Sequence, residues 1–264
     1  MELDDAYANG AYIEGAEAYP DRWAALARDF TFAQTARGKA RMGVPYGTGA
    51  REKFDLFLPE ADAPRGLLIF VHGGYWLRFD RSDWSHLAKG ALAHGFAVAL
   101  PSYDHCPDVR ISKITQQIAQ AVAAAAVLVD GPIALAGHSA GGHLVARMCA
   151  PGLLPPEVAA RLAHVMPISP LSDLHPLMQT SMNADLGLTE EEARAESPLF
   201  QPAPAVPVTV WVGADERPAF LDQARWLAET WGCGHVVAPG KHHFDVIDAL
   251  AEPDSQMIAT LVGE

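Results

Sequence analysis

The chain has 264 residues, half of them hydrophobic, and a formal net charge of −13 at pH 7. These values suit one large domain with a substantial core. The negative charge argues against nucleic acid or an anionic membrane as partner, because both bind to clusters of Lys and Arg. Three widely spaced cysteines and an acidic N-terminus without an apolar segment predict a soluble, cytoplasmic protein that lacks disulfides.

The first 40 residues are predicted to form an N-terminal extension that contains one helix over residues 21–30. Two strands are expected next, at residues 41–46 and 53–58, joined by a glycine-rich turn. Together these elements precede the first strongly apolar segment of the chain.

From residue 66 onward, apolar strand-like runs alternate with helical patterns. The alternation predicts an α/β fold with a mostly parallel central sheet and helices on both of its faces. The expected strands are residues 66–71, 97–100, 133–136, 164–168, 206–212 and 235–238, and the expected helices are 82–94, 111–129, 217–231 and 246–262, the last broken near Pro253.

The most informative motif is Gly-His-Ser-Ala-Gly at residues 137–141, which stands between the apolar strand 133–136 and a helical segment. A serine on a tight strand-to-helix turn is the nucleophile elbow of the α/β-hydrolase fold. The turn needs glycines because larger side chains on either side of the serine would collide. The sequence therefore predicts Ser139 as the nucleophile of an acyl-enzyme mechanism.

An elbow serine in this fold is followed along the chain by an acid and then by a histidine. Asp215 is predicted to be the acid because it directly follows the strand 206–212, and its neighbour Glu216 is the residue that could be confused with it. Asp173, which follows the preceding strand, is a weaker candidate. His243 is preferred to His242 as the base because it opens an apolar helix.

The segment His-Gly-Gly-Tyr-Trp at residues 72–76 follows the buried strand 66–71. Its glycines allow backbone N–H groups to approach a developing oxyanion, so Gly73, Gly74 and Ala140 are the predicted oxyanion donors. Tyr75 and Trp76 are predicted to bind an aromatic substrate, with packing beneath the cap as the alternative.

Residues 171–207 interrupt the alternation with acidic residues, methionines and prolines, and they are interpreted as a cap-like excursion within a single domain of residues 1–264. No paired His, Cys or acidic spacing predicts a metal site, and no cofactor is expected. The expected partner is a small ester or amide, and a homo-oligomer is compatible with the sequence.

The motifs at residues 72–76 and 137–143, with His-Phe at 243–244, resemble the arylformamidase (kynurenine formamidase) group of α/β-hydrolases. The resemblance implies hydrolysis of N-formyl-kynurenine to kynurenine and formate. A substrate carboxylate would need a cation, and Arg78 and Lys241 are the nearest in sequence. The alternatives are a small-acyl carboxylesterase or thioesterase and, more remotely, a ligand-binding protein without catalysis.

Overall fold

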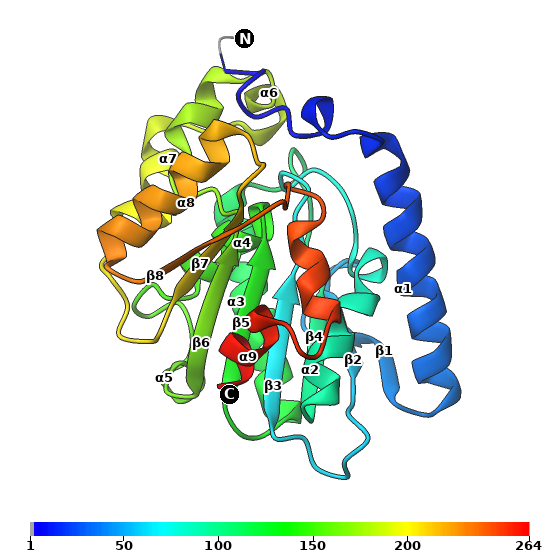
Figure 1. Ribbon diagram of the computed structural model, residues 1–264. Helices are drawn as coiled ribbons and strands as arrows, with labels where there is room; N and C mark the ends of the chain where they lie inside the picture. Colours follow the sequence, from blue (N-terminus) through cyan, green and yellow to red (C-terminus); the bar gives the residue numbers. More distant parts are fainter. Residues whose placement is uncertain (1–2, 264) are drawn as a thin grey trace.

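A computed structural model describes residues 3–263, which form a mixed eight-stranded sheet flanked by helices (Figure 1). The strand order is β1-β2-β4-β3-β5-β6-β7-β8. The first two strands are antiparallel to their neighbours, and the strands from β4 to β8 are parallel. The strands are β1 (Ala40–Pro45), β2 (Lys53–Phe57), β3 (Gly66–Val71), β4 (Phe96–Pro101), β5 (Ile133–His138), β6 (Leu162–Ile168), β7 (Thr209–Gly213) and β8 (Gly234–Ala238). The predicted α/β-hydrolase architecture is confirmed.

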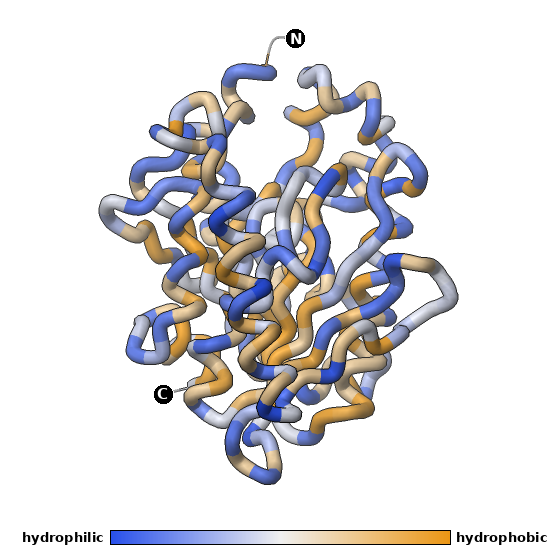
Figure 2. The backbone as a smooth tube through the Cα atoms, turned by 90° about the vertical axis from the view of Figure 1, so that its right-hand side faces the viewer, coloured by the Kyte–Doolittle hydropathy of each residue, from blue (hydrophilic) through white to orange (hydrophobic). Residues whose placement is uncertain are grey.

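Strand β3 shows why the central strands are apolar throughout. Its side chains alternate between the two faces of the sheet, and each face is covered by helices. Leu67 and Ile69 belong to one hydrophobic cluster, whereas Leu68 and Phe70 belong to the other. The tube in Figure 2 accordingly carries its hydrophobic segments mainly in the interior and its hydrophilic ones mainly in the outer turns.

Two sets of helices cover these two faces. The first face carries α3 (Ile111–Leu128), α4 (Ala140–Arg147) and α8 (Pro218–Trp231). The second carries α1 (Tyr19–Ala36), α2 (Lys89–Ala93) and α9 (Gln256–Val262). A membrane-spanning helix is absent from residues 3–263, where none combines the required length and hydropathy.

Several element boundaries differ from the prediction. The helix expected at residues 82–94 is instead two short 3-10 turns, Arg81–Asp83 and Ser85–Ala88, followed by α2. A capping box between Asp80 and Asp83 starts the first turn. Strand β7 begins at Thr209 rather than at residue 206, because Pro207 has no N–H to donate to a ladder.

Residues 171–207 form short helices, among them α6 (Asn183–Leu186) and α7 (Glu190–Glu196), and α5 (Pro156–Ala159) precedes β6. Side-chain hydrogen bonds join this segment to α3 and α4. The buried Glu196 carboxylate accepts hydrogen bonds from Thr115 (2.7 Å) and Arg147 (3.2 Å). In Figure 1 the N-terminal residues cross the top of the molecule from above α6 to α1.

Candidate active site

Ser139 lies at the carboxyl end of β5, on the turn into α4. Its backbone has φ 56° and ψ −117°, a conformation that few non-glycine residues adopt. The Ser139 N–H donates to the Ile168 carbonyl oxygen at 2.8 Å, which holds the turn against β6. This strained, well-anchored geometry is that of a nucleophile elbow.

The glycines around Ser139 are required by close backbone approach. A Cβ on Gly137 would lie 2.1 Å from the Gly141 carbonyl oxygen, and one on Gly141 would lie 1.9 Å from that of Val71. A Cβ on Gly73 would lie 2.9 Å from the Cβ of Ser139. The loop after β3 therefore packs directly against the elbow, as the two motifs require.

His243 follows β8 and lies beside the elbow. Its Nδ1 is 2.6 Å from the Glu216 Oε2 atom, and both side chains are almost completely buried. Because a carboxylate only accepts hydrogen bonds, Nδ1 carries the proton and Nε2 is left as an acceptor. The imidazole is clamped between the rings of Phe220 and His138, whose centroids are 4.3 and 4.6 Å away.

The prediction of Asp215 as the acid is corrected by this geometry, because Glu216 is the carboxylate bonded to His243. Asp215 is exposed, and its N–H donates to the Lys241 carbonyl oxygen at 2.9 Å. A tight turn after Gly213 directs side chain 215 outward and side chain 216 back beneath the strand ends. The extra methylene of glutamate gives it the reach to meet the imidazole.

Glu216 is held in place by two further donors. Its Oε1 atom accepts the Gly213 N–H at 2.8 Å and the Ser169 hydroxyl at 2.5 Å. Ser169 is fully buried at the end of β6 and has φ 47°, in the left-handed region. Fixed donors of this kind hold a carboxylate in one orientation.

His242 occupies a different environment from His243. Its Nε2 is 3.0 Å from the Tyr19 hydroxyl, and its Nδ1 faces the N–H of Phe244 at 3.1 Å. Of the two adjacent histidines, only His243 borders the cavity that contains Ser139.

His138 also borders this cavity. Burial lowers its pKa well below the ordinary value for histidine, and its Nε2 has no hydrogen-bond partner within the described residues. A neutral imidazole therefore stands next to His243, which avoids charge repulsion when His243 takes up a proton.

The loop that carries Gly73 and Gly74 is strained. Three of its non-glycine residues, Tyr75, Trp76 and Phe79, have positive φ angles of 53°, 59° and 74°. Such conformations cost on the order of 1–3 kcal/mol each and persist only where surrounding contacts enforce them. The Tyr103 hydroxyl supplies one such contact by donating to the His72 carbonyl oxygen at 3.0 Å.

Tyr75 and Trp76, predicted together as substrate-binding residues, face opposite directions. Tyr75 borders the cavity, and its hydroxyl donates to the Tyr7 carbonyl oxygen at 2.7 Å. Trp76 is fully buried in the core, edge-on to His143 at 5.1 Å between ring centroids, and is not part of the cavity lining. The prediction for Trp76 is corrected, because its ring packs in the core and only Tyr75 reaches the cavity.

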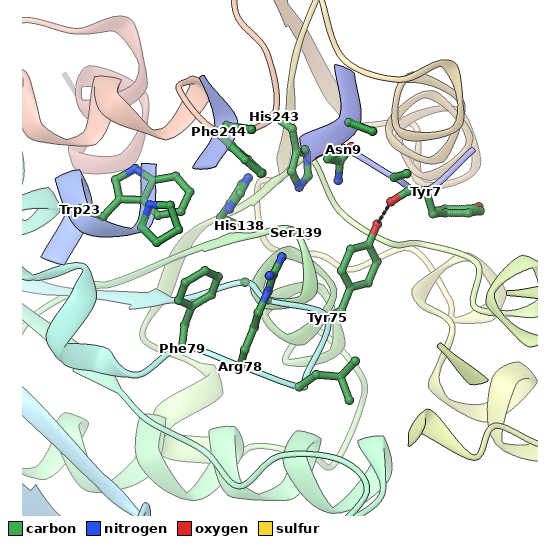
Figure 3. Close-up of a pocket in the computed structure, with 18 of the residues that line it drawn as sticks. Tyr7, Asn9, Trp23, Tyr75, Arg78, Phe79, His138, Ser139, His243 and Phe244 are labelled. Carbon is green, nitrogen blue, oxygen red and sulfur yellow. Dashed lines mark hydrogen bonds between the residues drawn. The ribbon is translucent and has the colours of Figure 1, made fainter. Parts of the chain in front are cut away.

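Ser139 and His243 border a cavity of about 660 Å³ (Figure 3). One side of it is an aromatic wall, which comprises Trp23, Phe79, Trp84 and Phe244. Neighbouring rings in this wall have centroids 4.7 to 5.9 Å apart. Its size and apolar lining suit a small aromatic molecule.

Much of the cavity cover comes from the N-terminal residues. Residues 7–11, 16, 17, 20 and 23 all line it, whereas the excursion 171–207 contributes Met182 alone among the described residues. The cap-like excursion predicted at residues 171–207 therefore contributes only a small part of the cavity lining among the described residues. The sequence indicated an irregular segment but not where it lies.

The N-terminal strap, defined as residues 3–18, is held by side chains from distant elements. Arg217 pairs with Asp5 at 2.8 Å and lies over the Tyr12 ring, 3.6 Å from its centroid. Gln223 donates to the Tyr7 hydroxyl at 3.0 Å. Tyr7, Trp23 and Ser169 were not predicted as site residues, because only tertiary contacts bring them to the strand ends.

The two cations named from the sequence differ in position. Arg78 lines the cavity, whereas Lys241 lies outside it and pairs with Asp245 at 3.5 Å. Within residues 3–263, no three His, Cys, Asp or Glu side chains converge in a way that could hold a metal ion.

Known proteins share both this fold and parts of this sequence. A family model described as BD-FAE matches residues 54–152, which include the loop after β3 and the elbow. A kynurenine formamidase of Salmo salar is 28% identical over 255 residues, which cover 88% of this chain and 85% of that protein.

Two solved structures extend the comparison. A protein of Silicibacter sp., provisionally named a thioesterase, is 61% identical, with 99% of each chain covered and a TM-score of 0.97. Esterase B of Lactobacillus rhamnosis, at 18% identity and a TM-score of 0.66 over 91% of this chain and 99% of that one, shares the fold. The kynurenine formamidase relatives support a hydrolase, and the esterase structure shows the shared fold.

Proposed function

We propose that this chain, which belongs to the arylformamidase-like family of α/β-hydrolases, is a serine hydrolase that cleaves small aryl formamides. The observation that carries the proposal is the convergence of Ser139, His243 and the His243-bound Glu216 at one end of the sheet, beneath the aromatic wall. The preferred substrate is N-formyl-kynurenine, the substrate that the sequence resemblance implies.

In the proposed reaction, the Ser139 hydroxyl attacks the formyl carbon while His243 Nε2 takes its proton. The amides of Gly73, Gly74 and Ala140 stabilise the oxyanion of the tetrahedral intermediate. His243 then returns the proton to the departing aryl amine, which leaves a formyl ester on Ser139.

Water completes the cycle. His243 removes a proton from a water molecule, which attacks the formyl ester through a second oxyanion. Collapse releases formate and restores the Ser139 hydroxyl. Throughout both halves, Glu216 keeps the imidazole in the tautomer that presents Nε2 to the substrate and stabilises its protonated form.

A second candidate is hydrolysis of small thioesters or esters, because the Silicibacter relative at 61% identity is named a thioesterase. The same residues would act, with a thiol or alcohol as leaving group. Pocket shape rather than the reacting residues would separate the two activities.

The test compares kcat/KM for N-formyl-kynurenine, acetyl-coenzyme A and p-nitrophenyl acetate. We expect the formamide to be preferred and Ser139→Ala to remove turnover of all three substrates. A wild-type protein that prefers the thioester or ester would contradict the formamidase proposal while leaving the serine mechanism intact. Unchanged turnover by Ser139→Ala would contradict the mechanism itself.

A further inference from the structure

Arg78 is the only cationic Lys or Arg side chain among the described residues that line the cavity. It is exposed, and it has no ion pair or hydrogen bond to any other residue within 3–263. In Figure 3 its side chain extends into the pocket between Phe79 and Tyr75, with the guanidinium end toward Ser139. An unpaired guanidinium in this position has its donors available for a ligand.

Two arginines near this loop, Arg51 and Arg81, both have partners. Arg51 donates to the carbonyl oxygens of Tyr103 and Phe79, each at 2.7 Å. Arg81 pairs with Asp55 at 2.9 Å. These two arginines brace the backbone and neutralise carboxylates, whereas Arg78 does neither.

The surroundings of Arg78 are suited to orient it. Its guanidinium carbon is 5.1 Å from the centroid of Phe79, whose ring belongs to the aromatic wall. Stacking on an aromatic face restricts the orientation of a guanidinium without occupying its N–H groups. These N–H groups point outward in the plane of the guanidinium, where they can bind a planar anion.

The overall charge of the molecule makes such a cation informative. A net charge of −13 repels anionic ligands at long range, so an anionic substrate needs a local cation to be held. Among the described residues that line the cavity, the one acidic side chain is Glu17 on the N-terminal strap. Glu17 cannot bind an anion, which leaves Arg78 for that role.

We infer that Arg78 binds a carboxylate on the aryl part of the substrate, so that the enzyme selects anionic aryl amides or esters over neutral ones. The inference rests on the proposed function, since it places the aryl group in the same cavity. A bidentate pair between guanidinium and carboxylate would fix the aromatic ring relative to Ser139. Selectivity would therefore appear in kcat/KM for matched charged and neutral substrates.

The test uses 3-formamidobenzoate and its neutral isostere 3-formamidobenzamide, with formate release as the readout. We expect the wild-type protein to prefer the carboxylate by about tenfold or more in kcat/KM. Arg78→Met should lose about 10- to 100-fold on the carboxylate and change the neutral rate by less than about threefold. Arg78→Lys should retain part of the preference, because it keeps the charge but not the planar fork.

Arg194→Met is the matched control, because Arg194 is also exposed and stacked on a phenylalanine, with its guanidinium carbon 5.5 Å from the ring centroid of Phe200. It lies outside the cavity and should leave the preference unchanged. Glu17→Gln changes the charge of the cavity lining but leaves the Arg78 guanidinium in place. It therefore distinguishes direct contact with Arg78 from a general electrostatic effect on the ligand. If this variant altered the preference as strongly as Arg78→Met, direct binding by Arg78 would be overturned.

The ester pair 3-acetoxybenzoate and 3-acetoxybenzamide is measured in parallel. A protein that cleaves only this pair would contradict the formamidase proposal and still report on Arg78. If Arg78→Met kept the wild-type preference, or lost activity equally on the charged and neutral members of whichever pair is cleaved, the inference would be wrong.

Discussion

Glu216 and Asp215 are neighbours in the chain but lie in opposite environments. One carboxylate is buried against His243, and the other is exposed on the turn. We expect Glu216→Gln to lower kcat by about 10²- to 10⁴-fold, because the amide no longer stabilises the protonated imidazole. Asp215→Asn, the same chemical change one residue away, should alter kcat by less than about threefold. Equal losses in both variants would contradict the assignment of Glu216.

Ser169 tests whether the support of the acid matters for catalysis. Removing its hydroxyl deletes one of the two donors to Glu216 Oε1, so Ser169→Ala should lower kcat by about 3- to 30-fold with little change in KM. Ser197→Ala is the control, because Ser197 is equally buried and its hydroxyl donates to the Ala193 carbonyl oxygen away from the cavity. Both variants should lose similar stability in urea, and only the first should lose kcat.

At the scale of elements, the carboxyl ends of five parallel strands supply the candidate site. The loop after β3, the elbow after β5, Ser169 after β6, Glu216 after β7 and His243 after β8 all meet at one edge of the sheet. Parallel strands expose their carboxyl ends at the same edge, which is why α/β sheets bind ligands there. The N-terminal strap then closes this edge from outside the sheet.

The attachment of the strap to α8 predicts a change in substrate binding. Arg217→Met removes the ion pair with Asp5 and the contact with the Tyr12 ring. We expect KM to rise by about two- to fivefold with kcat nearly unchanged, because a looser strap weakens the cavity cover without touching the reacting groups. Hydrogen exchange of residues 5–12 should become faster.

Arg225→Met is the matched control for this prediction. Arg225 lies on α8, is exposed, and pairs with Asp222 and Glu229 of the same helix. Its loss should leave both KM and the exchange of residues 5–12 at wild-type values. A rise in KM for both variants would assign the effect to α8 or to net charge rather than to the strap.

At the scale of the whole molecule, buried neutral histidines link stability to pH. Burial lowers the pKa of His72 and His86 to about 4 and that of His143 to about 3. In the unfolded chain these groups titrate at their ordinary values, so the unfolded state binds more protons below about pH 6.5. The contribution of these neutral histidines to the free energy of unfolding is therefore fully present above that pH. It is lost progressively as the pH decreases toward 4.

His86 provides the cleanest measurement of this linkage, because neither of its ring nitrogens has a hydrogen-bond partner within the described residues. The free energy of unfolding should decrease between pH 7 and pH 5 in both proteins. The decrease should be about 2 kcal/mol smaller in His86→Leu than in the wild type. Urea unfolding at the two pH values measures the difference. Identical losses in both proteins would show that His86 does not contribute.

The sequence by itself determined the βα alternation, the parallel sheet and the position of Ser139. These features follow from local rules: apolar runs predict buried strands, and a tight strand-to-helix turn needs glycines on both sides of its serine. It also favoured two adjacent carboxylates for the acid, with Asp173 as a weaker candidate, and limited the base to two adjacent histidines. Local patterns do not encode which of two neighbouring side chains turns inward.

Only the tertiary structure decided those directions and brought remote residues to the site. The turn after β7 points Glu216 rather than Asp215 at His243, and the strained loop after β3 buries Trp76 while Tyr75 faces the cavity. The N-terminal strap reaches the strand ends through contacts with residues more than 60 positions away, such as the hydrogen bond from Tyr75 to Tyr7. Such contacts depend on packing in three dimensions, for which the sequence of one chain carries no local signal.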